Sequence, residues 1–150
     1  MKIYLAGPCD TDHRTMMVNA ARGLRNLKYE VYCPWELKIE DAWSYPQEEW
    51  ARMVFDADVT AINEADAIIM ISVGRNSTAG TNWEQGYAYA LNKPIYVIQV
   101  TNENTSLMTF CGCTLFINGD TNLIEPLCKI HQILTNQIDI HAEKCKTILT

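Results

Sequence analysis

Two uninterrupted apolar runs constrain the fold of this chain more than any other feature of its sequence. Residues 67–73 read AIIMISV and residues 95–100 read IYVIQV, and both are rich in β-branched side chains. A strand with one face in water alternates apolar and polar residues, whereas a strand covered on both faces does not. The two runs therefore predict strands of a parallel sheet that has helices packed on both faces.

The remaining segments alternate between strand patterns and helix patterns. Further strands are predicted at residues 2–6, 30–34 and 115–118, and helices at residues 14–27, 48–63, 81–91 and 123–134, with a loop over 35–46 and a weakly helical tail over 139–150. Such alternation is typical of βαβ units. The predicted fold class is α/β, an open parallel sheet of about five strands with helices on both faces, Rossmann- or flavodoxin-like. All 150 residues are expected to form one domain.

The charge of the chain limits its partners. The net charge is −6, and the 12 lysines and arginines form no basic run, which argues against a nucleic-acid partner. No apolar run is long enough to span a bilayer, so no membrane partner is expected. The opening MKIYLAGP is too short and too soon broken to serve as a signal peptide, so we expect a cytoplasmic location.

Six cysteines are spread along the chain, at positions 9, 33, 111, 113, 128 and 145. Cys111 and Cys113 have one residue between them, which is not the usual spacing of zinc ligands. We expect small buried or half-buried thiols rather than a metal site. A redox or metal protein built on the cysteines is the weakest functional alternative, and no metal or other cofactor is predicted.

Glu84 is the acidic residue whose position most suggests chemistry. Thr81 and Glu84 fit a capping box at the start of the predicted helix 81–91, which would give both side chains a purely structural role. In an open parallel sheet, however, ligands bind outside the carboxyl ends of the strands. Loops 7–14, 74–80 and 101–108 are expected to meet there, and Glu84 lies one turn beyond the second of them.

Several phrases, taken in order, resemble the nucleoside 2-deoxyribosyltransferase family. They are IYLAGP at 3–8, EEWARMVFDADVTAINEAD at 48–66, ADAIIMIS at 65–72, GTNWEQGYAYALNKP at 80–94 and TSLM at 105–108. The resemblance extends from about residue 2 to residue 120, and it also takes in the related nucleoside 5′-monophosphate N-glycosidases. It implies cleavage of an N-glycosidic bond, with a role in purine or pyrimidine salvage and a small-molecule nucleoside or nucleotide as the partner.

The resemblance also implies catalytic roles for three residues. Glu84 matches the nucleophile that attacks the anomeric carbon and forms a covalent glycosyl-enzyme. Tyr4 matches a tyrosine that orients the nucleophile, although an aromatic core residue is an equal alternative. Asp58 matches an aspartate that contacts the base and can pass a proton to the leaving nitrogen. A solvated helix aspartate is the alternative for Asp58, and the family spacing selects it over Asp56.

Two substrate-binding positions depart from the base-exchanging members. Thr78 stands where those members have an aspartate that holds the sugar 5′-hydroxyl, and Ser106 stands where they have an asparagine. An aspartate would repel a 5′-phosphate, whereas a hydroxyl would not. The loop Gly74–Gly80 offers Arg75, hydroxyls and amides before a helix, which outlines a phosphate cradle. This favours a 5′-monophosphate slightly over the free 2′-deoxynucleoside and leaves hydrolysis or base exchange open.

The other predicted substrate-binding residues come from the chemistry of the loop 74–80 and from the family motifs. The full predicted set comprises Gly7, Arg75, Ser77, Thr78, Gly80, Ser106 and Met108. Met108 matches a residue that reaches into a neighbouring subunit's site, so a homo-oligomer is expected with Ser106 and Met108 near a neighbouring site. A loop methionine that packs locally is an equal alternative. The runner-up function is a nucleotide-binding or sensing domain without catalytic activity.

Overall fold

Five parallel strands form one sheet in the order β2-β1-β3-β4-β5. The strands are β1 (Lys2–Ala6), β2 (Glu30–Tyr32), β3 (Ala67–Ser72), β4 (Ile95–Gln99) and β5 (Leu115–Asn118). All four pairings between neighbours are parallel. The computed structural model describes residues 1–141, 143 and 144. The predicted α/β class, with an open parallel sheet of five strands, is confirmed, and the strand order is that of flavodoxin-like folds.

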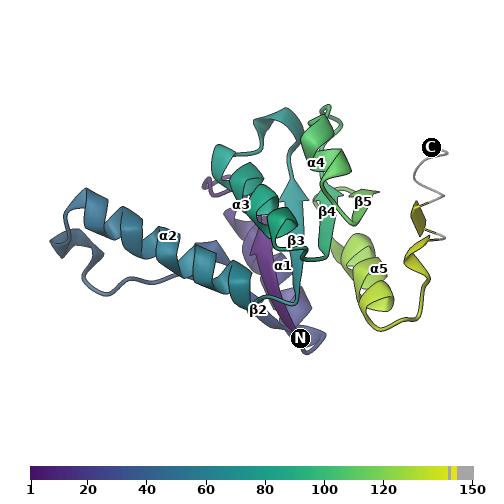
Figure 1. Cartoon of the computed structure of the whole chain (residues 1–150), viewed down its shortest axis with the longest axis horizontal. Coiled ribbons are helices and arrows are strands. Elements are labelled where there is room, and N and C mark those ends of the chain that lie inside the picture. Colours follow the sequence, from purple (N-terminus) through teal and green to yellow (C-terminus); the bar gives the residue numbers. More distant parts are fainter. Residues whose placement is uncertain (142, 145–150) are drawn as a thin grey trace.

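Helices cover both faces of the sheet (Figure 1). They are α1 (Arg14–Asn26), α2 (Gln47–Glu64), α3 (Ala79–Ala90), α4 (Leu107–Cys111) and α5 (Ile124–Leu134), with short 3₁₀ turns η1 (Pro34–Glu36), η2 (Ala42–Ser44) and η3 (Gly74–Asn76). The helix α4 was not expected, since the predicted loop 101–108 includes its first two residues and no element was predicted for the other three. The tail prediction is met by helical residues at 140, 141, 143 and 144 only, and residues 142 and 145–150 lie outside the described part.

Alternation along the strands divides the core into two layers. Ile3 and Leu5 of β1 pack with α1 and α5, whereas Tyr4 and Ala6 point to the opposite layer, towards α2 and α3. The predicted orientation of Tyr4, opposite to Ile3 and Leu5, is confirmed. Residues of β3 and β4 divide in the same way, and every residue of both strands is buried, as their unbroken apolar runs predicted. Tyr4 is completely buried, so any role it has is exercised from inside the fold.

The helix α2 extends beyond the sheet at its N-terminal half (Figure 1). Ile62, near its C-terminal end, is its one buried residue. Its outer part leaves Trp50, Met53 and Phe55 substantially exposed. An aromatic contact joins α2 to α3, because the rings of Phe55 and Trp83 lie 5.4 Å apart between centroids. The helix is thus attached to the body near its C-terminal half and carries partly exposed apolar side chains further out.

Candidate active site

The carboxyl ends of β1 and β3 form the point where the strand order reverses, and the loops that follow them are tied together there. The Thr81 hydroxyl on α3 donates to the carbonyl oxygen of Gly7 at 2.9 Å. The indole N–H of Trp35 donates to the carbonyl oxygen of Pro8, also at 2.9 Å. These bonds fix the loop after β1 against α3 on one side and against η1 on the other. The crevice predicted for ligands in this class of sheet is therefore bounded by ordered backbone.

Tyr4 and Glu84 meet directly at this crevice. The Tyr4 hydroxyl donates a 2.8 Å hydrogen bond to Oε1 of Glu84, across the interface between β1 and α3. The two residues are 80 positions apart in the chain, so this contact depends on the fold. The sequence predicted both residues for one site, and the structure brings them together. A buried phenol that donates to a carboxylate fixes one of its two oxygens and leaves the other for a ligand.

Burial dominates the ionisation of Glu84. Loss of solvent raises the pKa of its carboxyl to about 7, the Tyr4 hydrogen bond opposes this rise, and the charge of Asp58 adds to it. The N-terminus of α3 does little to stabilise the negative charge of Glu84. Glu84 is the sixth residue of α3, and the favourable field of a helix end fades within its first turn.

Asp58 lies beside this pair and is held by another tyrosine. The Tyr32 hydroxyl of β2 donates to Oδ1 of Asp58 at 2.8 Å. Burial raises the pKa of Asp58, and the bond from Tyr32 lowers it in part. Asp58 is half-buried whereas Asp56 is exposed. The site thus holds two carboxylates of raised pKa, an arrangement typical of acid–base chemistry.

Sequence reasoning missed two residues of this cluster, Tyr32 and Cys9. The rings of Tyr4 and Tyr32 stack at 5.4 Å with an interplanar angle of 15°. Partial desolvation of the Cys9 thiol and the negative charges of Glu84 and Asp58 together raise its pKa to about 11, so this thiol lies within the field of the two carboxylates. The parallel pairing of the first two strands was the signal for Tyr32, because register places it beside Tyr4.

The N-terminus of α3 is capped by Thr78, so the predicted capping box of Thr81 and Glu84 is wrong. The Thr78 hydroxyl oxygen accepts from the backbone N–H of Thr81 at 3.2 Å, and the helix begins at Ala79. The two threonine hydroxyl oxygens lie 2.8 Å apart. Because Thr81 gives its one hydroxyl proton to Gly7, Thr78 is the donor between them. The Thr78 proton is therefore engaged within the protein.

The other predicted phosphate-binding residues surround a tight turn after β3. Gly74 adopts φ of +71°, a conformation that favours glycine, and η3 begins there. The backbone N–H of Val73 donates to the half-buried Ser77 hydroxyl at 3.1 Å. Arg75 and Gly80 are exposed on the same loop. The turn thus presents one arginine and a helix start at the crevice edge, while Ser77 also stabilises the turn itself.

Two further glycine and loop predictions have clear positions. Gly7 is buried, and a Cβ atom there would come within 2.5 Å of the terminal atoms of Met17, so its backbone lies close to α1. Ser106 caps α4 by accepting from the N–H of Met108 at 3.1 Å. Ser106 and Met108 line a groove of about 400 Å³ between α3 and α4, together with Asn82. Met108 is 82% exposed, so its side chain is presented outward.

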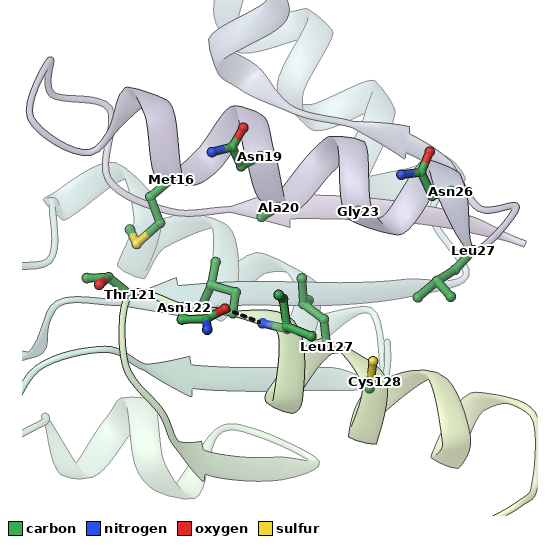
Figure 2. A pocket seen from close by; sticks show the side chains of 12 residues that line it. Met16, Asn19, Ala20, Gly23, Asn26, Leu27, Thr121, Asn122, Leu127 and Cys128 are labelled. Carbon is green, nitrogen blue, oxygen red and sulfur yellow. Dashed lines mark hydrogen bonds between the residues drawn. The ribbon is translucent and has the colours of Figure 1, made fainter.

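A second groove lies on the opposite face of the sheet, between α1 and α5 (Figure 2). It has a volume of about 390 Å³ and is lined mainly by apolar groups, among them Met16, Ala20, Leu27 and Leu127. Ala20 and Leu127 belong to the core layer of Ile3 and Leu5, which is separated by the sheet from Tyr4. This groove therefore contributes nothing to the carboxylate cluster.

The cysteines are only partly as expected. The five in the described part are free thiols, of which Cys33 is buried, Cys113 is intermediate, and Cys9, Cys111 and Cys128 are exposed. The expectation of buried or half-buried thiols is therefore wrong for these last three, while Cys145 lies outside the described residues. Over residues 1–141, 143 and 144, His, Cys, Asp and Glu form no group of three suited to a metal ion. No helix in that part is long and apolar enough to cross a membrane.

Several solved structures have a fold similar to that of this chain. A 2-deoxyribosyltransferase from Bacillus psychrosaccharolyticus is 32% identical, matches 83% of this chain and 90% of its own, and gives a TM-score of 0.70. A conserved protein from Enterococcus faecalis V583 is 18% identical over 86% of this chain and 98% of its own, also with a TM-score of 0.70. The CMP N-glycosidase BcmB of Clostridium botulinum is 19% identical over 87% and 98%, with a TM-score of 0.60.

The last two structures share the fold at low identity, and no curated protein sequence matches the chain. The family model for nucleoside 2-deoxyribosyltransferase matches residues 3–143, which is nearly the whole chain. That range includes the tyrosines, Asp58 and Glu84 of the cluster described above. The chain therefore belongs to the nucleoside 2-deoxyribosyltransferase family of enzymes.

Proposed function

We propose that this protein cleaves the N-glycosidic bond of a nucleoside or nucleoside 5′-monophosphate through a covalent glycosyl-Glu84 intermediate. The observation that carries the proposal is the 2.8 Å hydrogen bond from Tyr4 to Glu84, with Asp58 close enough for its charge to act on Glu84. One carboxylate oxygen is held by the phenol, so the other is free to approach a sugar. A carboxylate in this position both stabilises an oxocarbenium-like transition state and bonds to it.

The reaction proceeds in two displacements. An oxygen of ionised Glu84 forms a bond to the anomeric carbon while the bond from that carbon to the base nitrogen breaks. The departing nitrogen takes the electron pair of the broken bond and a proton from Asp58. A water molecule or a second base then attacks the same carbon and gives up a proton to the Asp58 carboxylate, while the bond from that carbon to Glu84 breaks and the Glu84 carboxylate leaves. Tyr4 keeps the Glu84 carboxylate in place throughout, because its hydroxyl is supplied by a fully buried strand residue.

A 5′-monophosphate is the substrate that we favour slightly over a free 2′-deoxynucleoside. Thr78 brings no negative charge to the place where an aspartate would repel phosphate, and Arg75 adds an exposed cation on the same loop. The two similar structures that carry activity names are a 2-deoxyribosyltransferase and a CMP N-glycosidase, one on each side of this choice. With the Thr78 proton engaged in the cap, phosphate would be held by Arg75, Ser77 and backbone amides at the start of α3.

We further propose that the enzyme is a homo-oligomer. Leu107 and Met108, at the start of α4, are 80% and 82% exposed, and Trp43 before α2 is fully exposed. Large apolar side chains left in water near a crevice are typical of a protein interface. A second copy that covers α4 would bring Ser106 and Met108 close to a neighbouring site.

One assay tests the proposed reaction. The protein is incubated with deoxynucleosides and their 5′-monophosphates, with and without adenine or cytosine as acceptor, and free base is followed by chromatography. We expect release of base from at least one substrate and its loss in Glu84→Ala. Intact mass spectrometry of an Asp58→Asn variant with a substrate that carries an N-methylated cationic base is expected to show the protein carrying one sugar group, because that base leaves without a proton from Asp58. Absence of base release from every substrate would instead indicate a binding domain without turnover.

A further inference from the structure

We propose that Tyr32 is a positioning residue for the reaction. It binds Oδ1 of Asp58 and so orients this carboxyl group to deliver a proton from Oδ2 to the leaving base. This inference rests on the function proposed above, and it concerns a residue that the family resemblance did not assign. Tyr32 lies at the end of β2, the edge strand, and Asp58 comes from the middle of α2. The inference therefore concerns how an edge strand controls a helix-borne acid.

The position of Tyr32 is set by strand register. Tyr4 and Tyr32 are Cα partners in the parallel pair of β1 and β2, so their side chains leave the sheet on the same face. Their rings stack at 5.4 Å, and Tyr4 is fully buried. The Tyr32 ring is therefore supported along its length by a ring that cannot move independently of the core. A hydroxyl held in this way has little freedom in where it points.

The two stacked tyrosines serve two different carboxylates. The Tyr4 hydroxyl donates to Glu84 and the Tyr32 hydroxyl donates to Asp58, each at 2.8 Å. Each helix acid therefore receives its own donor from a neighbouring strand. Neither phenol is shared, so the orientation of Glu84 and the orientation of Asp58 are each set by a separate hydrogen bond.

The hydrogen bond from Tyr32 determines which oxygen of Asp58 carries a proton. Oδ1 accepts the Tyr32 proton, and no donor from residues 1–141, 143 and 144 reaches Oδ2. When Asp58 is protonated, a proton on Oδ1 would face the proton of Tyr32, so Oδ2 is the favoured site. Tyr32 thus selects which oxygen carries the transferable proton. The charged and titratable groups around Asp58 are Tyr32 on β2, Tyr4 on β1, Glu84 on α3 and Cys9 in the loop after β1.

The test compares two leaving groups on the same sugar in wild type and Tyr32→Phe. One substrate carries a neutral base, and the other carries its N-methylated cationic counterpart, such as 7-methylguanine or 3-methylcytosine. A cationic base departs as a neutral molecule and needs no proton. We expect Tyr32→Phe to lower the single-turnover rate of base release for the neutral base by about 10- to 100-fold, the range for a lost hydrogen bond to a charged group. The cationic base should lose less than about 3-fold.

Two further variants separate a positioning role from a structural one. Asp58→Asn should show the same leaving-group dependence, and the double variant should lose little more than Asp58→Asn alone, because both changes act on one proton transfer. Tyr29→Phe is the matched control. It removes a hydroxyl that bonds His131 on the other face, and it should leave both substrates unaffected.

The outcomes distinguish this inference from the proposed function. A wild-type protein that releases no base overturns both. Base release that is lost in Glu84→Ala, combined with equal losses on both bases in Tyr32→Phe, overturns the positioning role alone. An unchanged single-turnover rate of base release for the neutral base also overturns it, and so does a double variant whose losses multiply.

Discussion

The hydroxyl of Tyr4 lies 2.8 Å from Oε1 of Glu84, and it reaches that carboxylate from a strand that is buried on both sides. Removing the hydroxyl while keeping the ring tests what this contact does. Tyr4→Phe should lower kcat by about 10- to 100-fold, because it removes a hydrogen bond to a charged group. It should also shift the acid side of the pH profile to higher pH, since the Tyr4 hydrogen bond lowers the pKa of Glu84 and its loss raises that pKa. Steady-state kinetics from pH 5 to 9 measure both effects, and a variant with wild-type kcat at every pH would contradict the orienting role.

The ionisation of Glu84 predicts the acid side of the pH profile. The nucleophile must be ionised in the free enzyme, and its pKa is raised by burial to about 7. The value of kcat/KM should therefore rise with pH up to about pH 7 and fall tenfold per unit well below it. Because Asp58 is coupled to Glu84, the measured value belongs to the pair. A profile that is flat between pH 5 and pH 8 would be incompatible with Glu84 as the group that must lose its proton.

The same burial predicts a pH-dependent gain in stability for Glu84→Gln. A carboxyl whose folded pKa lies above its usual 4.5 holds its proton more tightly when folded, so the native protein loses stability as pH rises from about 4.5 to about 7. Glutamine carries no such charge and can still accept from Tyr4. The variant should thus be more stable than wild type at pH 8, by at most on the order of 3 kcal/mol, and similar at pH 4.5.

Chemical denaturation at the two pH values measures this difference. Glu48→Gln is a control, because Glu48 is an exposed acid in the first turn of α2. A gain for Glu84→Gln that is equal at both pH values would show that the effect does not come from the buried charge.

Substitution of Thr78 tests the preference for a 5′-phosphate. Aspartate and asparagine are both good N-cap residues, so Thr78→Asp and Thr78→Asn should retain the start of α3. Only aspartate adds a negative charge beside the proposed phosphate site. We expect Thr78→Asp to lower monophosphate turnover by about 10-fold or more relative to nucleoside turnover, which is a differential of about 1.4 kcal/mol. Thr78→Asn should change the two alike, and equal losses in both variants would remove the argument from charge.

The exposed start of α4 predicts an interface. Met108→Asp should shift the protein to smaller species in sedimentation velocity and reduce turnover, because a charge at 82% exposed Met108 would be buried on assembly. Ile124→Asp is the matched control, since Ile124 is 70% exposed at the start of α5. A wild-type protein that sediments as a monomer, or a Met108→Asp variant with unchanged size and rate, would contradict the interface.

The apolar runs predicted β3 and β4 within one residue at their ends, because strands buried on both faces leave an unambiguous pattern. The start of α3 was misplaced for a physical reason. Thr81 and Glu84 match the capping rule as well as Thr78 does, but the fold gives the Glu84 carboxylate to Tyr4 and the Thr81 proton to Gly7. The helix α4 is five residues long and mostly exposed, so it leaves little amphipathic pattern to detect.

The residues of the site likewise include some that the sequence predicted and one that it did not. Glu84, Tyr4 and Asp58 came from a resemblance in ordered motifs, and the structure brings them together. Tyr32 stands in a three-residue strand, where nothing in the local sequence distinguishes a functional tyrosine from a packing one. Its partner is 26 residues away on α2, so the contact exists only once β2 and α2 are both placed against β1.

The stacking of Tyr4 on Tyr32 has a consequence for how such a catalyst can diversify. Backbone hydrogen bonds hold neighbouring strands at about 4.8 Å. The spacing between Tyr4 and Tyr32, the tyrosines that bind the two acids, is therefore set by the main chain. Replacing a side chain can change the ionisation of Glu84 or Asp58, but it cannot change the spacing between β1 and β2. New sugars or bases must therefore be accommodated at the rim, where the turns after β1 and β3 are free to change in length and chemistry.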